Sequence, residues 1–196
     1  MTQYNICLAS ESPQRIIILR KLGIPFCTVR PEIEEIESAN PYFSQTAFEN
    51  SFRKALSVSE KYPDLPVLGA DTVIEFQNRS VGKPRSSKHA LEMLMSFSGK
   101  THCVLTAVTI ILRKKSTKCV FGDTTEVKMR NFTVETAKEY VGKVNVLGKA
   151  GAYAIQEHGD MLIESINGSF TNVVGLPKEK LLVALHHVFG NSCRKV

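Results

Sequence analysis

One acidic residue lies inside an otherwise apolar stretch, and this feature constrains the fold more than any other. Residues 66–75 read Pro-Val-Leu-Gly-Ala-Asp-Thr-Val-Ile-Glu, with Asp71 near the centre. A continuous apolar run of this kind predicts a strand buried on both faces of a sheet. A buried carboxylate is stable only beside a cation, a metal ion or hydrogen-bond donors. In the alternative, Asp71 begins a loop, but no turn residue separates the two halves. Asp71 is therefore our candidate catalytic or metal-binding residue.

The length of 196 residues predicts one domain, or one domain with two lobes. No apolar run is long enough to span a bilayer, and the N-terminus lacks the pattern of a signal peptide. We therefore expect a cytoplasmic protein with no membrane partner. The net charge of +6 favours a polyanionic ligand. The basic residues are dispersed and form no stripe with aromatic side chains, so nucleic acid is not expected as a partner.

The cysteines are odd in number and scattered, and none of them form a CxxC pair. This pattern predicts neither a disulfide framework nor a zinc site. Four lie in strand-like runs and are interpreted as small core residues, whereas Cys193 lies in a polar tail. The four are Cys7, Cys27, Cys103 and Cys119.

The first strand, expected over 5–9, leads into a turn that favours an anion. Ser12 is a good N-cap and Pro13 suits the first helical position, so a helix is expected to follow and to stop at Gly23. A capping box would place Glu at the third helical position, but this chain has Arg15. Two hydroxyls, free backbone N–H groups and a guanidinium then converge, and phosphate would satisfy all of them. The alternative, that Arg15 points to solvent, stays open.

Hydrophobic periodicity predicts the remaining elements. A strand is expected over 26–30, and a long antiparallel hairpin over 101–132 carries no assigned chemistry, with His102 interpreted as structural. Four further helices are expected: over 40–61, from a Ser87 cap to Gly99, from a Thr133 cap to Tyr140, and at the end of the chain with Leu181, Leu182, Leu185 and Val188 on one face.

Three more charged features are candidates for a site. The loop over 31–37 carries four carboxylates, which are either solvated or include a magnesium ligand. Lys54 falls at the edge of the apolar face of its helix, so its ammonium is expected in a cleft or in solvent. Lys83 lies between a flexible glycine and a rigid proline.

Five segments, in this order, resemble the Maf family of nucleoside triphosphate pyrophosphatases, and together they span essentially the whole chain. Each segment alone is a weak signal, but five in register are specific. They are LASESPQR at 8–15, GADTV at 69–73, GKP at 82–84, KAGAYAIQ at 149–156, and INGS at 166–169 with VGLP at 174–177.

The resemblance implies an elongated, two-lobed α/β fold with a mixed twisted sheet and a central cleft, formed by one domain over 1–196. It implies hydrolysis of a nucleoside triphosphate to the monophosphate and pyrophosphate with a divalent cation, Mg²⁺ or Mn²⁺. The segment KAGAYxIQ is similar to the subgroup acting on dTTP and UTP, with modified pyrimidine nucleotides as further substrates. The family often dimerises, which leaves a homodimer open.

The resemblance also assigns roles to individual positions. Asp71 matches the proton acceptor that activates the attacking water, and Glu35 matches an acidic position that helps Asp71 to place the metal. Positions that hold the phosphates are matched by Ser10, Ser12, Arg15, Lys54 and Lys83. Positions associated with nucleotide selectivity are matched by Gln14, Thr72 and Gln156.

Three departures from the family pattern bear on the substrate. Gln14 stands where an Arg is usual, and Asn145 and Gly148 stand where acidic residues are usual. These changes keep two alternatives open. One is a nucleotide-binding regulatory protein of septum formation and cell division with weak or no catalysis. The other is a pyrophosphatase with specificity like that of the related enzymes acting on 7-methyl-GTP.

Overall fold

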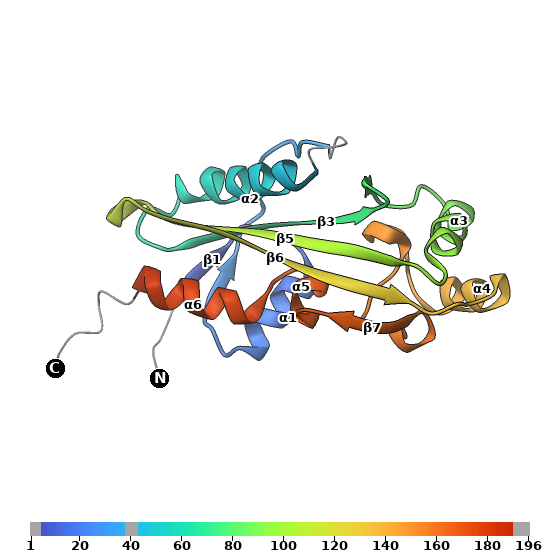
Figure 1. The fold of residues 1–196 in the computed structure, drawn as a ribbon. Helices are drawn as coiled ribbons and strands as arrows, with labels where there is room; N and C mark the ends of the chain where they lie inside the picture. Colours follow the sequence, from blue (N-terminus) through green and yellow to red (C-terminus); the bar gives the residue numbers. More distant parts are fainter. Residues whose placement is uncertain (1–4, 38–42, 190–196) are drawn as a thin grey trace.

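A computed structural model describes residues 5–37 and 43–189, which form an elongated molecule around one long mixed sheet (Figure 1). The strand order is β2-β1-β3-β5-β6-β7, and β4 pairs with β3. Among the described strands, the β1–β2 and β1–β3 pairs are parallel and the other pairs are antiparallel. The strands are β1 (Ile6–Leu8), β2 (Phe26–Thr28), β3 (Val67–Phe76), β4 (Arg79–Val81), β5 (Thr101–Leu112), β6 (Thr117–Met129) and β7 (Ile163–Asn167).

The helices cover the two faces and one end of this sheet (Figure 1). The longest, α2, packs on one face against β3 and β5, and α1, α5 and α6 gather on the other face. At the far end of the long strands, α3 packs against α4. Their bounds are α1 (Pro13–Lys21), α2 (Phe43–Ser59), α3 (Ser87–Phe97), α4 (Val134–Lys143), α5 (Phe170–Val174) and α6 (Lys178–Phe189).

Two apolar clusters give the molecule its two lobes. One holds Leu68 of β3 and Val108 of β5 beneath α1 and α6. The other holds Ile74 of β3 and Val104 of β5 beside α3 and α4. The same two strands run through both clusters, so the lobes share one sheet. The predicted mixed α/β fold is confirmed, and so is the interpretation of 66–75 as a buried central strand.

The sheet edge at β3 is interrupted where Asp71 lies. On this edge, β1 pairs with β3 only as far as Leu68, and β4 pairs with it only from Ile74 onward. Within the described residues, 69–73 therefore have no strand partner on this side, whereas β5 pairs with the whole stretch on the other side. Successive side chains leave a strand on opposite faces. A ligand at this gap can reach both Asp71 and Thr72, which point to opposite faces.

Gly69 brings α2 close to the strand at this gap. A Cβ on Gly69 would lie 2.7 Å from the backbone nitrogen of Ala55 in α2, and it would also clash with the carbonyl of Ser51. Only glycine permits this close packing of α2 on β3, which brings Lys54 of α2 within reach of Asp71.

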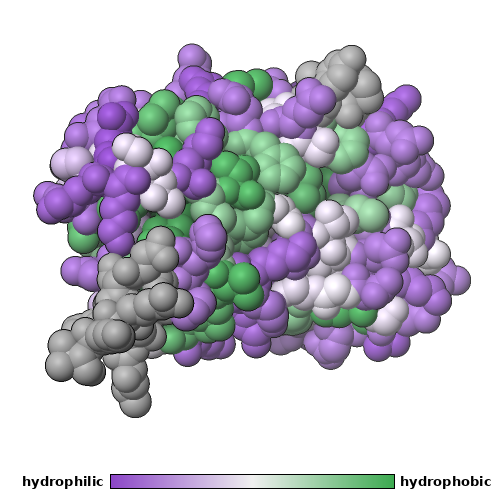
Figure 2. Space-filling model, turned by 60° about the vertical axis from the view of Figure 1, so that its left-hand side comes forward, coloured by the Kyte–Doolittle hydropathy of each residue, from purple (hydrophilic) through white to green (hydrophobic). Residues whose placement is uncertain are grey.

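Several local predictions are wrong in detail. The cap of α3 is Ser86, whose hydroxyl accepts from the His89 N–H at 3.1 Å, and not Ser87. Leu182 is 41% exposed because it turns away from the buried face of α6. Apolar side chains also reach the surface on the face shown in Figure 2. The helix predicted from 40 is described from Phe43, and its predicted first turn lies outside the described residues.

The cysteine prediction is confirmed only for Cys7, which is fully buried in β1. Cys27 is exposed because β2 is the edge strand, and Cys103 and Cys119 are half-buried. Cys193 lies outside the described residues. In the described ranges, no helix is both long and apolar enough to cross a bilayer.

Candidate active site

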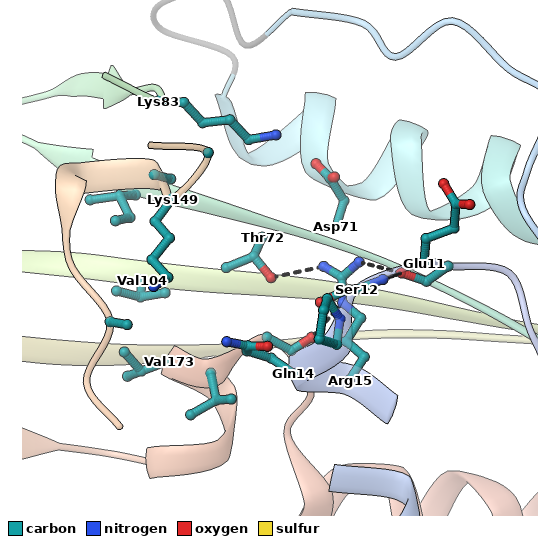
Figure 3. Close-up of a pocket in the computed structure, with 18 of the residues that line it drawn as sticks. Glu11, Ser12, Gln14, Arg15, Asp71, Thr72, Lys83, Val104, Lys149 and Val173 are labelled. Atoms are coloured by element: carbon teal, nitrogen blue, oxygen red, sulfur yellow. Dashed lines mark hydrogen bonds between the residues drawn. The ribbon is translucent and has the colours of Figure 1, made fainter. Parts of the chain in front are cut away.

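A cleft of about 720 Å³ opens at the interrupted edge of β3 (Figure 3). Its walls come from segments far apart in the sequence, which the fold gathers around Asp71. They are the turn after β1, the loop after β2, the loop after β4, the segment 145–156 and the end of α5. The cleft brings together all ten site residues expected from the sequence: Ser10, Ser12, Gln14, Arg15, Glu35, Lys54, Asp71, Thr72, Lys83 and Gln156.

Asp71 faces α2 and forms a nearly buried ion pair there. Lys54 Nζ lies 2.7 Å from Asp71 Oδ1 and 3.0 Å from Glu35 Oε1. The side chains of Lys54 and Asp71 are 6% and 11% exposed, whereas Glu35 is 58% exposed. Lys54 therefore projects into the cleft, and the alternative in which its ammonium lies in solvent is wrong. The acidic loop is not wholly solvated either, because Glu35 reaches into the site.

Arg15 lies on the opposite face and is held by three protein acceptors. Its Nε donates to the Gly175 carbonyl at 2.9 Å, Nη1 donates to Ser10 Oγ at 3.3 Å, and Nη2 donates to Thr72 Oγ1 at 3.1 Å. The interpretation of Arg15 as a solvent-facing residue is wrong, because it is buried. Burial lowers the pKa of Arg15, and the negative charges of Asp71 and Glu35 oppose this shift. Arg15 has five N–H groups, so two remain for a ligand within the described residues.

The turn before α1 presents backbone donors to the cleft. Ser12 occupies the N-cap position, but its hydroxyl makes no capping bond. Ser10 Oγ instead accepts from the Ser12 N–H at 3.1 Å, which shapes the turn. Pro13 is the first residue of the helix, and because proline has no backbone N–H, no donor is left unpaired at this position. The first turn of α1 contains no acidic residue, so its N-terminal dipole remains available for an anion.

Two lysines approach from the other wall. Lys83 is exposed and extends from the loop after β4 with its ammonium directed toward the Asp71 side of the cleft (Figure 3). Lys149 also lines the cleft, and its Nζ pairs with Glu157 Oε2 at 2.8 Å. Together with Arg15, Arg30 and Lys54, these lysines give the cleft five cationic side chains around one buried carboxylate, counted over the described residues.

The three positions expected to select the base, Gln14, Thr72 and Gln156, carry uncharged side chains and line the cleft. Gln14 and Gln156 both line the cleft, as do Asn145 and Gly148. The Oε1 atom of Gln14 is buried and has no hydrogen-bond partner among the described residues. The Thr72 hydroxyl is engaged with Arg15 at 3.1 Å and with Thr106 Oγ1 at 3.0 Å.

The chemistry of the donor set suits a divalent cation that arrives with its substrate. Asp71 and Glu35 both direct a carboxylate oxygen at one positive charge, the Lys54 ammonium. Within the described ranges, no cluster of three or more acidic, histidine or cysteine side chains could hold a metal by itself. Mg²⁺ is commonly bound through one or two carboxylates together with substrate phosphates. These two carboxylates fit that mode.

Known proteins resemble this chain over most of its length. A family model described as Maf-like protein matches residues 5–188. The chain belongs to the Maf-like family. The dTTP/UTP pyrophosphatase of Akkermansia muciniphila is 38% identical over 181 residues, covering 92% of this chain and 95% of that protein. The dTTP/UTP pyrophosphatase of Bacillus thuringiensis subsp. konkukian is 40% identical over 178 residues, covering 91% of this chain and 92% of that protein.

A solved structure, the Ham1 protein of Staphylococcus aureus, aligns with this Maf-like chain at a TM-score of 0.42 and 16% identity. The alignment covers 65% of this chain and 72% of that one.

Three charged residues of this Maf-like site have no role in the sequence predictions. Glu11 and Arg30 line the cleft and pair with each other at 3.4 Å between the turn after β1 and the loop after β2. Lys149 is the third. It opens the segment KAGAYAIQ, and a cation at the start of a family motif was a usable signal. Glu11 likewise lies in the family segment LASESPQR, whereas nothing in the sequence indicates Arg30, because its approach to Glu11 depends on the parallel pairing of β1 with β2.

Proposed function

We propose that this protein hydrolyses nucleoside triphosphates to the monophosphate and pyrophosphate, with dTTP and UTP as preferred substrates. The observation that carries the proposal is the position of Asp71. It lies in the gap of the sheet edge, with Lys54 and Arg15 on its two sides and Lys83 approaching across the same cleft. The names of the relatives at about 40% identity support the choice of substrate.

The cationic groups suit a chain of linked phosphates. Arg15 offers two N–H groups, Lys83 offers an ammonium, and the first turn of α1 offers backbone N–H groups with a favourable dipole. Charge-assisted hydrogen bonds of this kind are stronger than neutral ones. Because Arg15 is already held by three acceptors, its side chain loses little conformational entropy when phosphate binds.

Asp71 is the proposed general base. Its Oδ1 is paired with Lys54, and no hydrogen bond from the described residues reaches Oδ2. A water bound at Oδ2 would transfer a proton to the carboxylate while the oxygen of that water bonds to phosphorus. The bond to the bridging oxygen between the α- and β-phosphates breaks, and pyrophosphate leaves. Preorganised cations around the cleft stabilise the charge that develops on the phosphate oxygens.

Asp71 and Glu35 are the residues that would hold the divalent cation, Mg²⁺ or Mn²⁺. When bound, the metal would supply Lewis-acid stabilisation of phosphate oxygens. Lys54, which contacts both carboxylates, fixes their positions on the α2 side of the cleft.

The proposed base selectivity rests on uncharged side chains. Gln156 can both donate to and accept from the edge of a pyrimidine, and Gln14 brings a second side-chain amide to the same cleft. Uracil and thymine present one N–H donor between two carbonyl acceptors, which matches an amide. Thr72 would act on selectivity only indirectly, because its hydroxyl is engaged by Arg15 and Thr106.

Release of pyrophosphate from a panel of nucleotides tests this function. The panel contains the eight common triphosphates, modified pyrimidine triphosphates and 7-methyl-GTP, each assayed with Mg²⁺, with Mn²⁺ and with EDTA. We expect the highest kcat/KM for dTTP or UTP and no turnover with EDTA. Binding without turnover of any nucleotide would contradict the proposal and favour a regulatory protein. A preference for 7-methyl-GTP would overturn the substrate but not the reaction.

A further inference from the structure

A row of two hydroxyls, on the face of the sheet that α1 and α5 cover, connects Arg15 to α5. Thr72 of β3 contacts Arg15 Nη2 at 3.1 Å and Thr106 Oγ1 of β5 at 3.0 Å. Thr106 is fully buried, and its hydroxyl donates to the carbonyl of Asn172 in α5 at 2.9 Å. These contacts form an unbroken path from the cleft to α5. Only its first two members, Arg15 and Thr72, line the cleft.

The direction of every hydrogen bond in this path is fixed by counting protons. A threonine hydroxyl has one hydrogen to donate. Thr106 gives its hydrogen to the Asn172 carbonyl, which can only accept, so Thr72 must donate to Thr106. Thr72 then presents lone pairs to Arg15, which can only donate. Because all three bonds point the same way, each polarises and strengthens the next.

The same short helix holds Arg15 at a second point. Arg15 Nε donates to the carbonyl of Gly175, the C-cap of α5, three residues after Asn172. Asn172 is fully buried, and its Nδ2 donates to the Val104 carbonyl at 2.9 Å and to Thr125 Oγ1 at 3.0 Å, which ties α5 to β5 and β6. Thr106 therefore supports two of the three acceptors that hold the guanidinium: the Thr72 hydroxyl directly, and the Gly175 carbonyl through α5.

We propose that Thr106 is a positioning residue that orients Arg15 toward the phosphates through Thr72 and α5. The proposal rests on the proposed function, because it takes the group that Arg15 binds to be the triphosphate of a nucleotide. A hydroxyl buried among apolar strands costs stability unless it forms hydrogen bonds. One partner of the Thr106 hydroxyl is Thr72, which lines the cleft, so this hydrogen bonding is coupled to the site. Thr106 does not touch substrate, so its effect is on binding geometry rather than on the reacting atoms.

The test compares three substitutions on β5. Thr106→Val keeps the shape and removes the hydroxyl, and Thr106→Ser restores it. Thr109→Val is the matched control, because Thr109 is also fully buried on β5 but bonds to Ser51 Oγ of α2 at 2.9 Å and does not line the cleft. Calorimetry with inorganic triphosphate measures binding directly, and steady-state kinetics with dTTP give KM and kcat separately.

We expect Thr106→Val to weaken triphosphate binding and to raise KM about five- to tenfold, the worth of a neutral hydrogen bond, with kcat changed less than twofold. Thr106→Ser and Thr109→Val should stay within about twofold of the wild type in both quantities. Where the valine variant does not fold, Thr106→Ala removes the same hydroxyl without placing a methyl group against the Asn172 carbonyl.

Equal binding of triphosphate by Thr106→Val, or by Thr106→Ala, and by the wild type would overturn the proposal. An equal loss in Thr109→Val would also overturn it, because the effect would then be one of general stability. The calorimetric result does not depend on turnover. Failure of wild-type hydrolysis would therefore contradict the proposed function alone, and failure of the Thr106 comparison would contradict this inference alone.

Discussion

Lys54 Nζ lies 2.7 Å from Asp71 Oδ1, and both side chains are nearly withdrawn from solvent. The contact joins α2 to the centre of β3, at the gap in the sheet edge where the cleft opens. A carboxylate in an apolar strand requires such a partner. The same contact places a positive charge beside the proposed general base, so one ion pair serves both the fold and the site.

Replacing Lys54 with methionine should cost about 3 kcal/mol of unfolding free energy, because it leaves the nearly buried Asp71 carboxylate without its cation. Urea unfolding at pH 7 measures this loss. Lys61→Met is the matched control, since Lys61 pairs with Glu32 at 3.0 Å in a largely exposed ion pair on the surface. An exposed pair contributes about 1 kcal/mol or less. Equal unfolding free energies of the two variants would contradict this role for the Lys54–Asp71 pair.

Gly69→Ala should lower the unfolding free energy by about 1–3 kcal/mol, the usual cost of overpacking. The added Cβ would lie 2.7 Å from the Ala55 backbone nitrogen, so α2 must move away from β3 and carry Lys54 with it. Turnover should therefore fall as well. Gly142→Ala, in α4, is the control: nothing lies within 4 Å of its added Cβ, and it should stabilise by about 0.5–1 kcal/mol. A neutral Gly69→Ala would show that the close approach of α2 is not required.

Acid should destabilise the fold through His102. Its side chain is buried against Phe97 and bonds to the Tyr153 hydroxyl at 2.8 Å, and burial lowers its pKa from 6.5 to about 4. Below pH 6.5 the unfolded chain binds a proton here that the folded protein does not accept until about pH 4. Stability is therefore lost as the pH falls through this window, by about 2 kcal/mol at pH 5.

His102→Gln separates this effect from other titrations, because glutamine can still bond to Tyr153 but does not titrate. The unfolding free energy of the wild type minus that of the variant should fall between pH 7.5 and pH 5, since every other group titrates in both proteins. A difference independent of pH would contradict the assignment to His102.

The sequence predicted the elements with strong local signals. Asp71 interrupts a long apolar run, Ser12-Pro13 marks a helix start, and Thr133 caps α4 with its hydroxyl. Each of these signals acts within a few residues, so tertiary context does not override it. Ser86 and Ser87 show the limit of this approach. Both can cap a helix, and the choice between neighbouring serines depends on backbone geometry that residue type does not reveal.

The parts of the site that could not be predicted arise from pairings distant in sequence. The gap in the edge of β3 exists because β1 pairs with β3 only as far as Leu68, and β4 pairs with β3 only from Ile74 onward. Arg15 is held by Gly175, which is 160 residues away along the chain. Thr106 shows nothing unusual in its own strand, and its role follows only from the carbonyl of Asn172 on another element.

In the proposed reaction, Asp71 accepts the proton of the attacking water. The most direct measurement compares the wild type with Asp71→Asn, following pyrophosphate and orthophosphate release from dTTP with Mg²⁺ and measuring inorganic triphosphate binding by calorimetry. We expect one pyrophosphate and no orthophosphate per nucleotide hydrolysed by the wild type. We expect a rate at least about 100-fold lower in Asp71→Asn, with triphosphate binding retained. Turnover by Asp71→Asn at the wild-type rate would contradict this role of Asp71, and orthophosphate as the first product of the wild type would contradict the reaction.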